Sequence, residues 1–154
     1  MNEVLSLLKE NVVMHLATAS SDGKPRSSIM EYGMVGNTLI FATHHGSIKD
    51  MNLVDNPRVS LTVGLTPTYV AIDGTVTDPT PEEEEAFNKI LYDRHLRGIR
   101  SQVYSGKFTN PYHKYQDFRE MIMSGDINMQ YYKVIFDAAY YTHGTGPAKI
   151  IKMK

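Results

Sequence analysis

Short segments with the alternation typical of β-strands follow one another closely through the first half of the chain. They cover residues 12–20, 25–34, 38–43, 58–64 and 68–78, and only turns or one short helix separate them. Alternation of apolar and polar side chains is typical of strands that bury one face. Parallel strands need long crossover connections, and these segments leave no room for them. The pattern therefore predicts a mainly β fold, an antiparallel meander or barrel with flanking helices.

Turn signals mark the ends of these strands. The Asp22-Gly23 pair predicts a hairpin, and Gly36-Asn37 predicts the turn before the third strand. Gly74 interrupts the fifth strand and indicates a β-bulge. Two last strands are predicted at 131–142 and 148–153, on either side of a glycine-rich hairpin turn.

Helix signals flank the strand series on both sides. Residues 2–10 predict a short amphipathic helix. Thr80 is typical of an N-cap, Pro81 of the first helical position, and Glu83 of the third residue in a capping box. We expect a helical insertion over about residues 80–125. The buried stripe of its first helix is predicted to consist of Phe87, Ile90, Leu91, Ile99 and Val103.

Length and composition favour one ordinary globular domain. The chain has 154 residues, a formal net charge of −1 and no cysteine, so we expect a single domain over 1–154 without disulfides or thiolate metal sites. The charge favours neither nucleic acid nor an anionic membrane. Without a signal-peptide pattern or a long apolar run, we expect a cytoplasmic protein that binds no membrane. Adjacent His44 and His45 match no metal-ligand spacing, and no metal is expected.

The junction between the third strand and the short helix is the strongest candidate site. It reads "FATHHGSIKDMNLVDNPRV", and the strand end is followed by Gly46, a possible N-cap at Ser47 and a cation at Lys49. Helix N-termini carry unpaired N–H groups and partial positive charge, which suit an anion. With the hydroxyl of Thr43 added, the segment fits a phosphate group. The alternative is a capped helix with a surface lysine and no ligand.

The order of segments resembles the FMN-binding split-barrel superfamily of pyridoxamine 5′-phosphate oxidase. The resemblance covers about residues 12–103 and rests on "LATASSDGKPRSSIMEYG", "LIFATHHGSIKDMNLVDNPRVSLTV" and "YVAIDGTVTD" followed by an acidic helix. It implies an antiparallel Greek-key split barrel that forms a homodimer. It also implies one FMN in each of two clefts between the subunits.

The resemblance assigns roles to particular residues. It implies that Thr43, Ser47 and Lys49 bind the FMN phosphate, with Arg26 reaching it from the second strand. It also implies that the backbone of that strand lines the polar edge of the flavin ring. The ring-lining and neighbouring cofactor residues so implied are Ser27, Ser28, Ile29, Met30, His44, Ile48 and Tyr69.

Three departures from the oxidase pattern bear on the ligand. Ile48 stands at a basic position, Glu31 at a lysine position and Tyr69 at the position of a flavin-facing glutamine. Losing two cations weakens charge-assisted phosphate binding by about 1.5–3 kcal/mol for each hydrogen bond. The chain also has no tryptophan, a residue of the oxidase's substrate element. We therefore do not expect pyridoxamine 5′-phosphate oxidation, and F420 or haem are alternative cofactors.

The expected function is that of a flavin-dependent oxidoreductase, because no nucleophile or paired-carboxylate pattern stands out and the cofactor then supplies the chemistry. A small organic acceptor would take hydride or electrons from reduced flavin. His44 is the candidate proton donor, and its alternative is a polar residue in an exposed turn. The alternative function is a flavin- or haem-binding protein without turnover.

Overall fold

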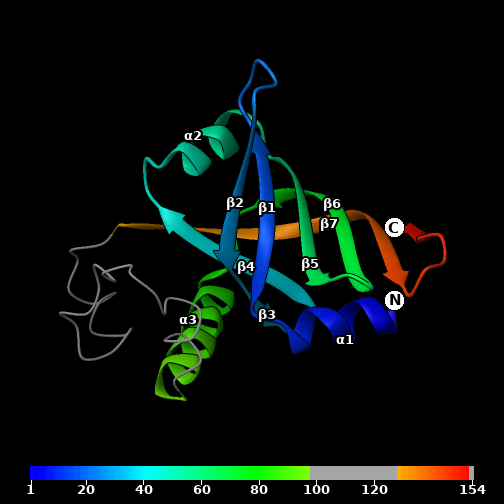
Figure 1. Ribbon diagram of the computed structural model, residues 1–154. Helices are drawn as coiled ribbons and strands as arrows, with labels where there is room; N and C mark the ends of the chain where they lie inside the picture. Colours follow the sequence, from blue (N-terminus) through cyan, green and yellow to red (C-terminus); the bar gives the residue numbers. More distant parts are fainter. Residues whose placement is uncertain (98–127, 153–154) are drawn as a thin grey trace, which may run out of the picture.

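Eight strands form one curled antiparallel sheet in the computed structural model, which describes residues 1–97 and 128–152 (Figure 1). The strand order is β2-β1-β5-β6-β7-β4-β3, and β8 pairs with β7. The predicted mainly β, antiparallel fold is confirmed. The elements are α1 (Asn2–Glu10), β1 (Val13–Ala19), β2 (Pro25–Glu31), β3 (Gly33–Val35), β4 (Thr38–His44), α2 (Ile48–Asp55), β5 (Arg58–Leu65), β6 (Thr68–Thr77), α3 (Pro81–Leu96), β7 (Met129–His143) and β8 (Lys149–Lys152).

Tyr32 separates the two ends of the sheet. We expected one strand over 25–34, but β2 pairs with β1, whereas β3 pairs with β4 at the opposite end of the strand order. The break arises because the Tyr32 N–H donates to the carbonyl of Val12 at 3.0 Å, and its hydroxyl donates to the carbonyl of Leu8 at 2.7 Å. The tyrosine is completely buried. It thus holds the chain where the sheet curls back on itself.

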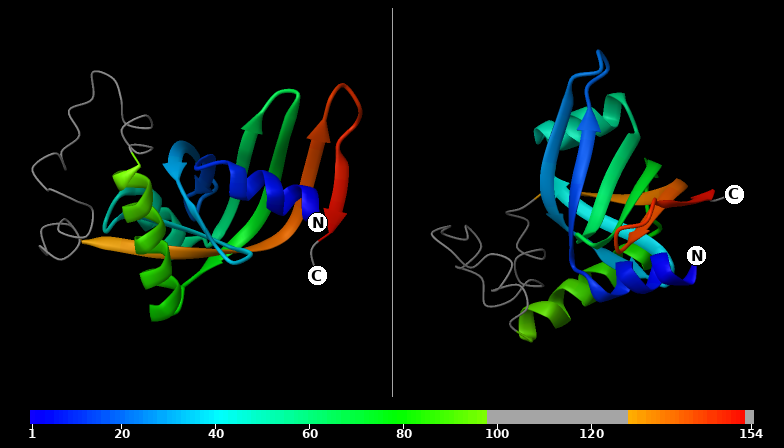
Figure 2. Two further views of the ribbon diagram at one scale, coloured as in Figure 1. Left: turned by 90° about the horizontal axis from the view of Figure 1, so that it is seen from below. Right: turned by 45° about the vertical axis from the view of Figure 1, so that its right-hand side comes forward.

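The main core fills the inside of the curled sheet. Met14 and Leu16 of β1 point inward, as the alternation predicts. Helices α1 and α2 lie at opposite ends of the sheet (Figures 1 and 2). Leu8 of α1 and Leu53 of α2 belong to the same buried cluster as the β1 residues. The short helix at 48–55 therefore has a packing role as well as a possible binding role.

Helix α3 covers the outer face of β3 and β4. Phe87 and Leu91 pack there with Ile40, so β4 is buried on both faces. The capping box is confirmed, because the Thr80 N–H donates to Glu83 at 2.8 Å and the Glu83 N–H donates to the Thr80 hydroxyl at 3.2 Å. Residues 98–127 of the expected insertion, with Ile99 and Val103 of its predicted stripe, lie outside the described residues.

The predicted bulge at Gly74 is confirmed and yields a stability prediction. The β6–β7 register shifts between Asp73 and Gly74, and a Cβ at Gly74 would lie 2.5 Å from the carbonyl oxygen of Ile135. Because that oxygen belongs to a paired strand, we expect Gly74→Ala to destabilise the fold by about 1–3 kcal/mol in urea unfolding. Gly146→Ala is the control, because a Cβ there meets no atom within 4 Å. Equal stability of the two variants would contradict this packing.

Candidate functional site

The end of β4 and the start of α2 form a compact polar turn. Ser47 is the N-cap of α2, and its hydroxyl accepts the N–H of Asp50 at 3.2 Å. The same hydroxyl lies 3.1 Å from the hydroxyl of Thr43, the buried residue near the end of β4. Gly46 adopts φ of 75°, a left-handed conformation that glycine accepts without strain. The structure therefore brings Thr43 and Ser47 together as the sequence predicts.

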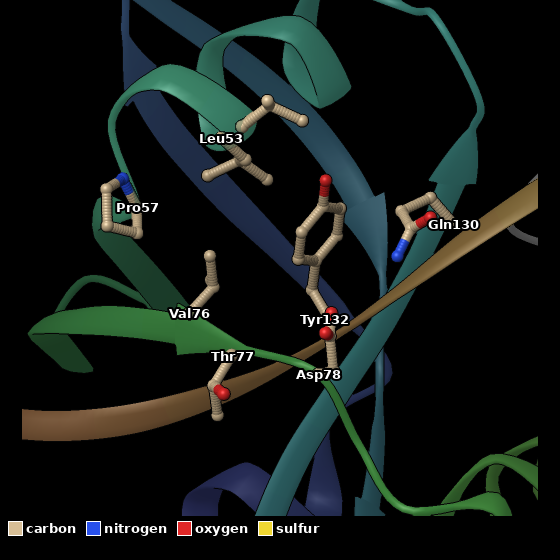
Figure 3. Close-up of a pocket in the computed structure, with 8 residues that line it drawn as sticks. Leu53, Pro57, Val76, Thr77, Asp78, Gln130 and Tyr132 are labelled. Atoms are coloured by element: carbon tan, nitrogen blue, oxygen red, sulfur yellow. The ribbon is translucent and has the colours of Figure 1, made fainter.

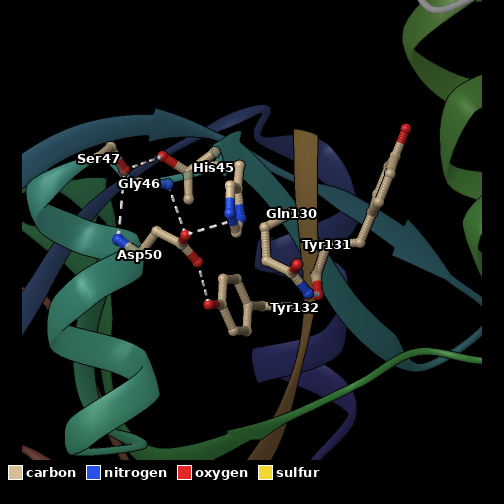
Figure 4. A network of polar contacts seen from close by, with 8 residues as sticks. His45, Gly46, Ser47, Asp50, Gln130, Tyr131 and Tyr132 are labelled. Atoms are coloured by element: carbon tan, nitrogen blue, oxygen red, sulfur yellow. Dashed lines mark hydrogen bonds and ion pairs between the residues drawn. The ribbon is translucent and has the colours of Figure 1, made fainter. Parts of the chain in front are cut away.

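A buried carboxylate organises this turn (Figure 4). The Asp50 side chain is 4% exposed, and it accepts the Gly46 N–H at 2.7 Å and the hydroxyl of Tyr132. Its oxygen also lies 3.4 Å from Nδ1 of His45. The first backbone donor of the turn is thus occupied within the chain. A phosphate would have to be held by the remaining groups, chiefly side chains.

The sequence did not predict either partner of the hydrogen bond between Tyr132 and Asp50, which lies at the centre of this network. The spacing of Ser47 and Asp50 is that of a capping box with aspartate in place of glutamate, so a closer reading would have singled out Asp50. Tyr132 comes from β7, where it pairs with Phe41 of β4. It is 82 positions from Asp50 in the sequence. No local pattern announces a contact between residues so far apart.

Tyr132 gives the network a pH dependence. Burial, followed by the hydrogen bond to Asp50, raises the pKa of its phenol well above the ordinary value of about 10. A raised folded-state pKa contributes stability that is complete below pH 10 and is lost as pH rises above it. We expect the free energy of unfolding to fall above about pH 10, by up to about 1.4 kcal/mol per pH unit for this group. Tyr132→Phe should flatten that fall, and parallel pH curves for the two proteins would contradict it.

Lys49 is the cation of the turn. It is half-buried at the second position of α2, and in the part of the chain that the structure describes it forms no ion pair. Its charge is therefore available to an anion beside Thr43 and Ser47. Ile48 is 49% exposed and adds apolar surface in place of a second cation.

Strand β2 pairs with β1, the strand that α2 contacts, and has one open edge. Arg26 is the cross-strand partner of Thr18, and paired residues of an antiparallel sheet point to the same face. Asn52 of α2 donates to the Thr18 hydroxyl at 3.1 Å, so Arg26 is on the face of the sheet that α2 covers. As the terminal strand of the described sheet, β2 has outer backbone groups without a strand partner. These groups belong to the predicted ring-lining stretch 27–30, in which Ile29 is 69% exposed.

Tyr69 does not join this cluster within one chain. The Cα partner of Thr43 on β7 is Gln130, whereas the partner of Tyr69 is Thr142. The twelve positions between Gln130 and Thr142 correspond to about 40 Å along an extended strand. Thr43 and Ser47 therefore lie together at the start of α2, and Arg26 is on the face of the sheet that α2 covers. Tyr69 of β6 pairs with β7 toward its other end.

Glu31 carries a charge that is already compensated. Its carboxylate lies 3.3 Å from the guanidinium of Arg94 on α3, and both side chains are largely buried. Arg94 also donates to the carbonyl of Tyr32. Glu31, which stands where the oxidase has a lysine, thus helps to attach α3 to the sheet. Because it is paired, it adds little net repulsion toward an anion near β2.

A pocket lies beside α2. It has a volume of about 320 Å³ and is bordered by α2, the end of β6 and the start of β7. Strands β1 and β2 lie behind it in Figure 3. None of the residues predicted to line the flavin ring borders this pocket.

Two expectations concern absent features. Among residues 1–97 and 128–152, no group of three or more His, Cys, Asp or Glu side chains stands together, and His44 is exposed at the end of β4. No helix in the described portion is long and apolar enough to cross a membrane.

Comparison with known proteins identifies the family. A family model described as pyridoxamine 5′-phosphate oxidase matches residues 1–109. The chain belongs to this family. A pyridoxine/pyridoxamine 5′-phosphate oxidase from Leptospira biflexa serovar Patoc is 36% identical over 80 residues, which are 50% of this chain. The match spans only 38% of the length of that curated relative.

Solved structures share the fold of this oxidase-family chain. A heme-binding protein from Mycobacterium smegmatis has a TM-score of 0.67 at 17% identity, covering 97% of this chain and 56% of that one. An FAD-binding protein from Mesorhizobium loti has a TM-score of 0.59 at 17% identity, covering 90% of each chain. An F420 reductase has a TM-score of 0.54 at 24% identity, covering 87% of this chain and 93% of that one. At these identities the likeness shows the split-barrel fold alone.

Proposed function

We propose that this chain binds FMN and acts as a flavin-dependent oxidoreductase toward a small organic acceptor. The observation that carries the proposal is the cluster at the start of α2. There, two hydroxyls lie together at the N-terminus of α2, and Lys49 follows in its first turn without an ion pair among the described residues. Arg26 is on the face of the sheet that α2 covers. Membership of the pyridoxamine 5′-phosphate oxidase family supports a flavin as the ligand.

The donor set fits a phosphate monoester. Thr43 and Ser47 supply hydroxyl donors, and Lys49 and Arg26 supply positive charge against a dianion. The carboxylate of Asp50 takes the backbone donor of Gly46, so binding relies on side chains and on the N–H groups of Ile48 and Lys49 at the start of α2. With fewer cations than the oxidase pattern has, we expect moderate affinity.

The open edge of β2 supports the placement of the flavin ring. Backbone N–H and C=O groups of 27–30 on that edge are free to bond the polar side of a planar heterocycle. Bound flavin supplies hydride or single-electron transfer, and the chain's own part is to hold the ring and limit its contact with water. His44, exposed at the end of β4, is the proposed proton donor to the acceptor.

A second copy of the chain is proposed to complete each site. Tyr69 of β6 pairs with Thr142, twelve positions along β7 from the partner of Thr43, and is too far away to reach the phosphate cluster of its own chain. In a homodimer, Tyr69 of one copy would face the ring held by the other. Ile48, 49% exposed beside Lys49, offers the apolar surface that a subunit contact requires.

We propose an acceptor other than pyridoxamine 5′-phosphate. Glu31 is engaged by Arg94, and Ile48 and Tyr69 replace polar groups of the oxidase pattern. The site therefore has fewer charges for a second phosphate-bearing molecule. A less polar acceptor, such as a quinone or nitroaromatic compound, suits it better.

The test has two stages. The small molecules released from the denatured, purified protein are first identified by mass, which separates FMN from F420 and haem. The protein loaded with FMN is then assayed with NADH or NADPH across quinones and nitroaromatics. FMN with measurable turnover supports both parts of the proposal. Bound FMN without turnover overturns the enzymatic part, and bound haem or F420 overturns the choice of cofactor.

A further inference from the structure

The pocket beside α2 is lined by residues from three parts of the fold. Leu53 and Val54 come from α2, and Tyr132 comes from the start of β7. Val76 belongs to the end of β6, and Asp78 follows it (Figure 3). Its volume of about 320 Å³ lies at the small end of ligand pockets. The geometry therefore suits one small molecule.

The lining combines an apolar wall with one charge. Leu53, Val54 and Val76 supply aliphatic surface. Asp78 is the single charged residue among those that line the pocket, and they include no lysine, arginine or histidine. The complete lining is Leu53, Val54, Pro57, Val76, Thr77, Asp78, Gln130 and Tyr132. Such a surface complements an apolar body that carries a positive group.

The electrostatics around Asp78 point the same way. Across the described residues, the Asp78 carboxylate has no hydrogen bond or ion pair. Its negative charge acts on a neighbouring carboxyl group. Burial is the main cause that raises the pKa of Glu84, and the charge of Asp78 is the second cause. The buried carboxylate of Asp50 lies behind Tyr132 and adds to the negative potential. A cation entering the pocket meets favourable charge from both.

Tyr132 gives the pocket a fixed aromatic wall. Its hydroxyl is held by Asp50, and Phe41 stacks on the ring with centroids 5.5 Å apart. A ring held at both its hydroxyl and its face loses little freedom when a ligand binds. Aromatic faces attract organic cations, and a nearby carboxylate strengthens the site. Tyr132 is 6% exposed, so only the part of its ring that borders the pocket is open to a ligand, and Asp78 supplies the negative charge.

We propose that this pocket binds a small organic cation, with its apolar body against Leu53, Val54 and Val76 and its ammonium group between Asp78 and the ring of Tyr132. The residues that line this pocket include none of those proposed to hold the flavin, although Tyr132 connects it to Asp50 of the neighbouring turn. Binding in the pocket therefore does not depend on which cofactor the chain binds. The class of ligand is a primary or substituted amine with one ring or a short chain.

Phenethylammonium chloride is the probe, and 2-phenylethanol is its neutral match. Binding to the protein as purified is measured by calorimetric or NMR titration. We expect saturable binding of the cation that is about tenfold or more tighter than that of the alcohol. Asp78→Asn should remove this preference, whereas Asp73→Asn, an exposed carboxylate of β6 outside the pocket, should keep it.

Val54→Arg supplies a second, independent variant. Val54 is 73% exposed, so arginine fits without disturbing the core and places a competing cation at the pocket. Binding of phenethylammonium should be lost, with the thermal midpoint unchanged. Three results would each overturn the proposal: no saturable binding to the wild-type protein, equal affinity for amine and alcohol, or unaltered preference in Asp78→Asn.

Discussion

Replacing Asp50 with alanine is expected to destabilise the protein by about 3 kcal/mol, because two donors lose their acceptor at once. The Gly46 N–H and the hydroxyl of buried Tyr132 both point at this carboxylate. Leaving the buried Tyr132 hydroxyl unsatisfied costs about 1–3 kcal/mol, losing the hydrogen bond of the Gly46 N–H in its exposed turn costs about 1 kcal/mol, and the exposed His45 adds little. Urea unfolding monitored by circular dichroism measures the change.

Matched variants separate this network from a general effect of removing an acid. Asp55, at the exposed C-terminal end of the same helix, should change stability by less than about 0.5 kcal/mol when replaced by alanine. Tyr132→Phe should cost less than Asp50→Ala, since it removes one bond and keeps the ring. An Asp50→Ala protein as stable as Asp55→Ala would refute the role of Asp50 as organiser of the turn.

Replacing Lys49 with methionine is expected to weaken FMN binding about tenfold to a hundredfold. A hydrogen bond to a charged group contributes about 1.5–3 kcal/mol, and about 1.4 kcal/mol corresponds to a factor of ten. Lys49 is half-buried beside Thr43 and Ser47, and within the described ranges it has no competing ion pair. Methionine keeps most of the aliphatic length, so the loss reports on the charge.

Riboflavin provides the control ligand, because it is FMN without the phosphate. Its affinity should be unchanged in Lys49→Met, and Lys89→Met on the exposed face of α3 should bind FMN like the wild-type protein. Adding Ser47→Ala should deepen the FMN loss while costing about 1 kcal/mol of stability as a lost N-cap. An equal loss of affinity for FMN and for riboflavin would show that Lys49 does not bind the phosphate.

Local signals predicted most of the fold correctly. The turn at Asp22-Gly23, the bulge at Gly74 and the capping box at Thr80 each depend on residues close in sequence. The N-cap at Ser47 belongs to the same class. Such features follow from backbone conformation and short-range hydrogen bonds, which a sequence displays directly.

Contacts between distant residues were not predictable in the same way. The break at Tyr32 depends on partners in α1 and the segment that follows it. The bond from Tyr132 to Asp50 joins residues 82 positions apart, and Arg94 meets Glu31 across 63 positions. Alternation identifies which face of a strand is buried but not which polar group it meets there. The contact between Thr43 and Ser47 was therefore predictable, whereas the carboxylate that organises their turn was not.

The most direct measurement is the visible absorption spectrum of the purified protein, before and after addition of FMN and removal of excess ligand. The expected result is a flavin spectrum with one FMN per chain, displaced only weakly by riboflavin. A colourless protein that retains no FMN would contradict the proposed site and would leave the turn from Thr43 to Asp50 as a helix cap.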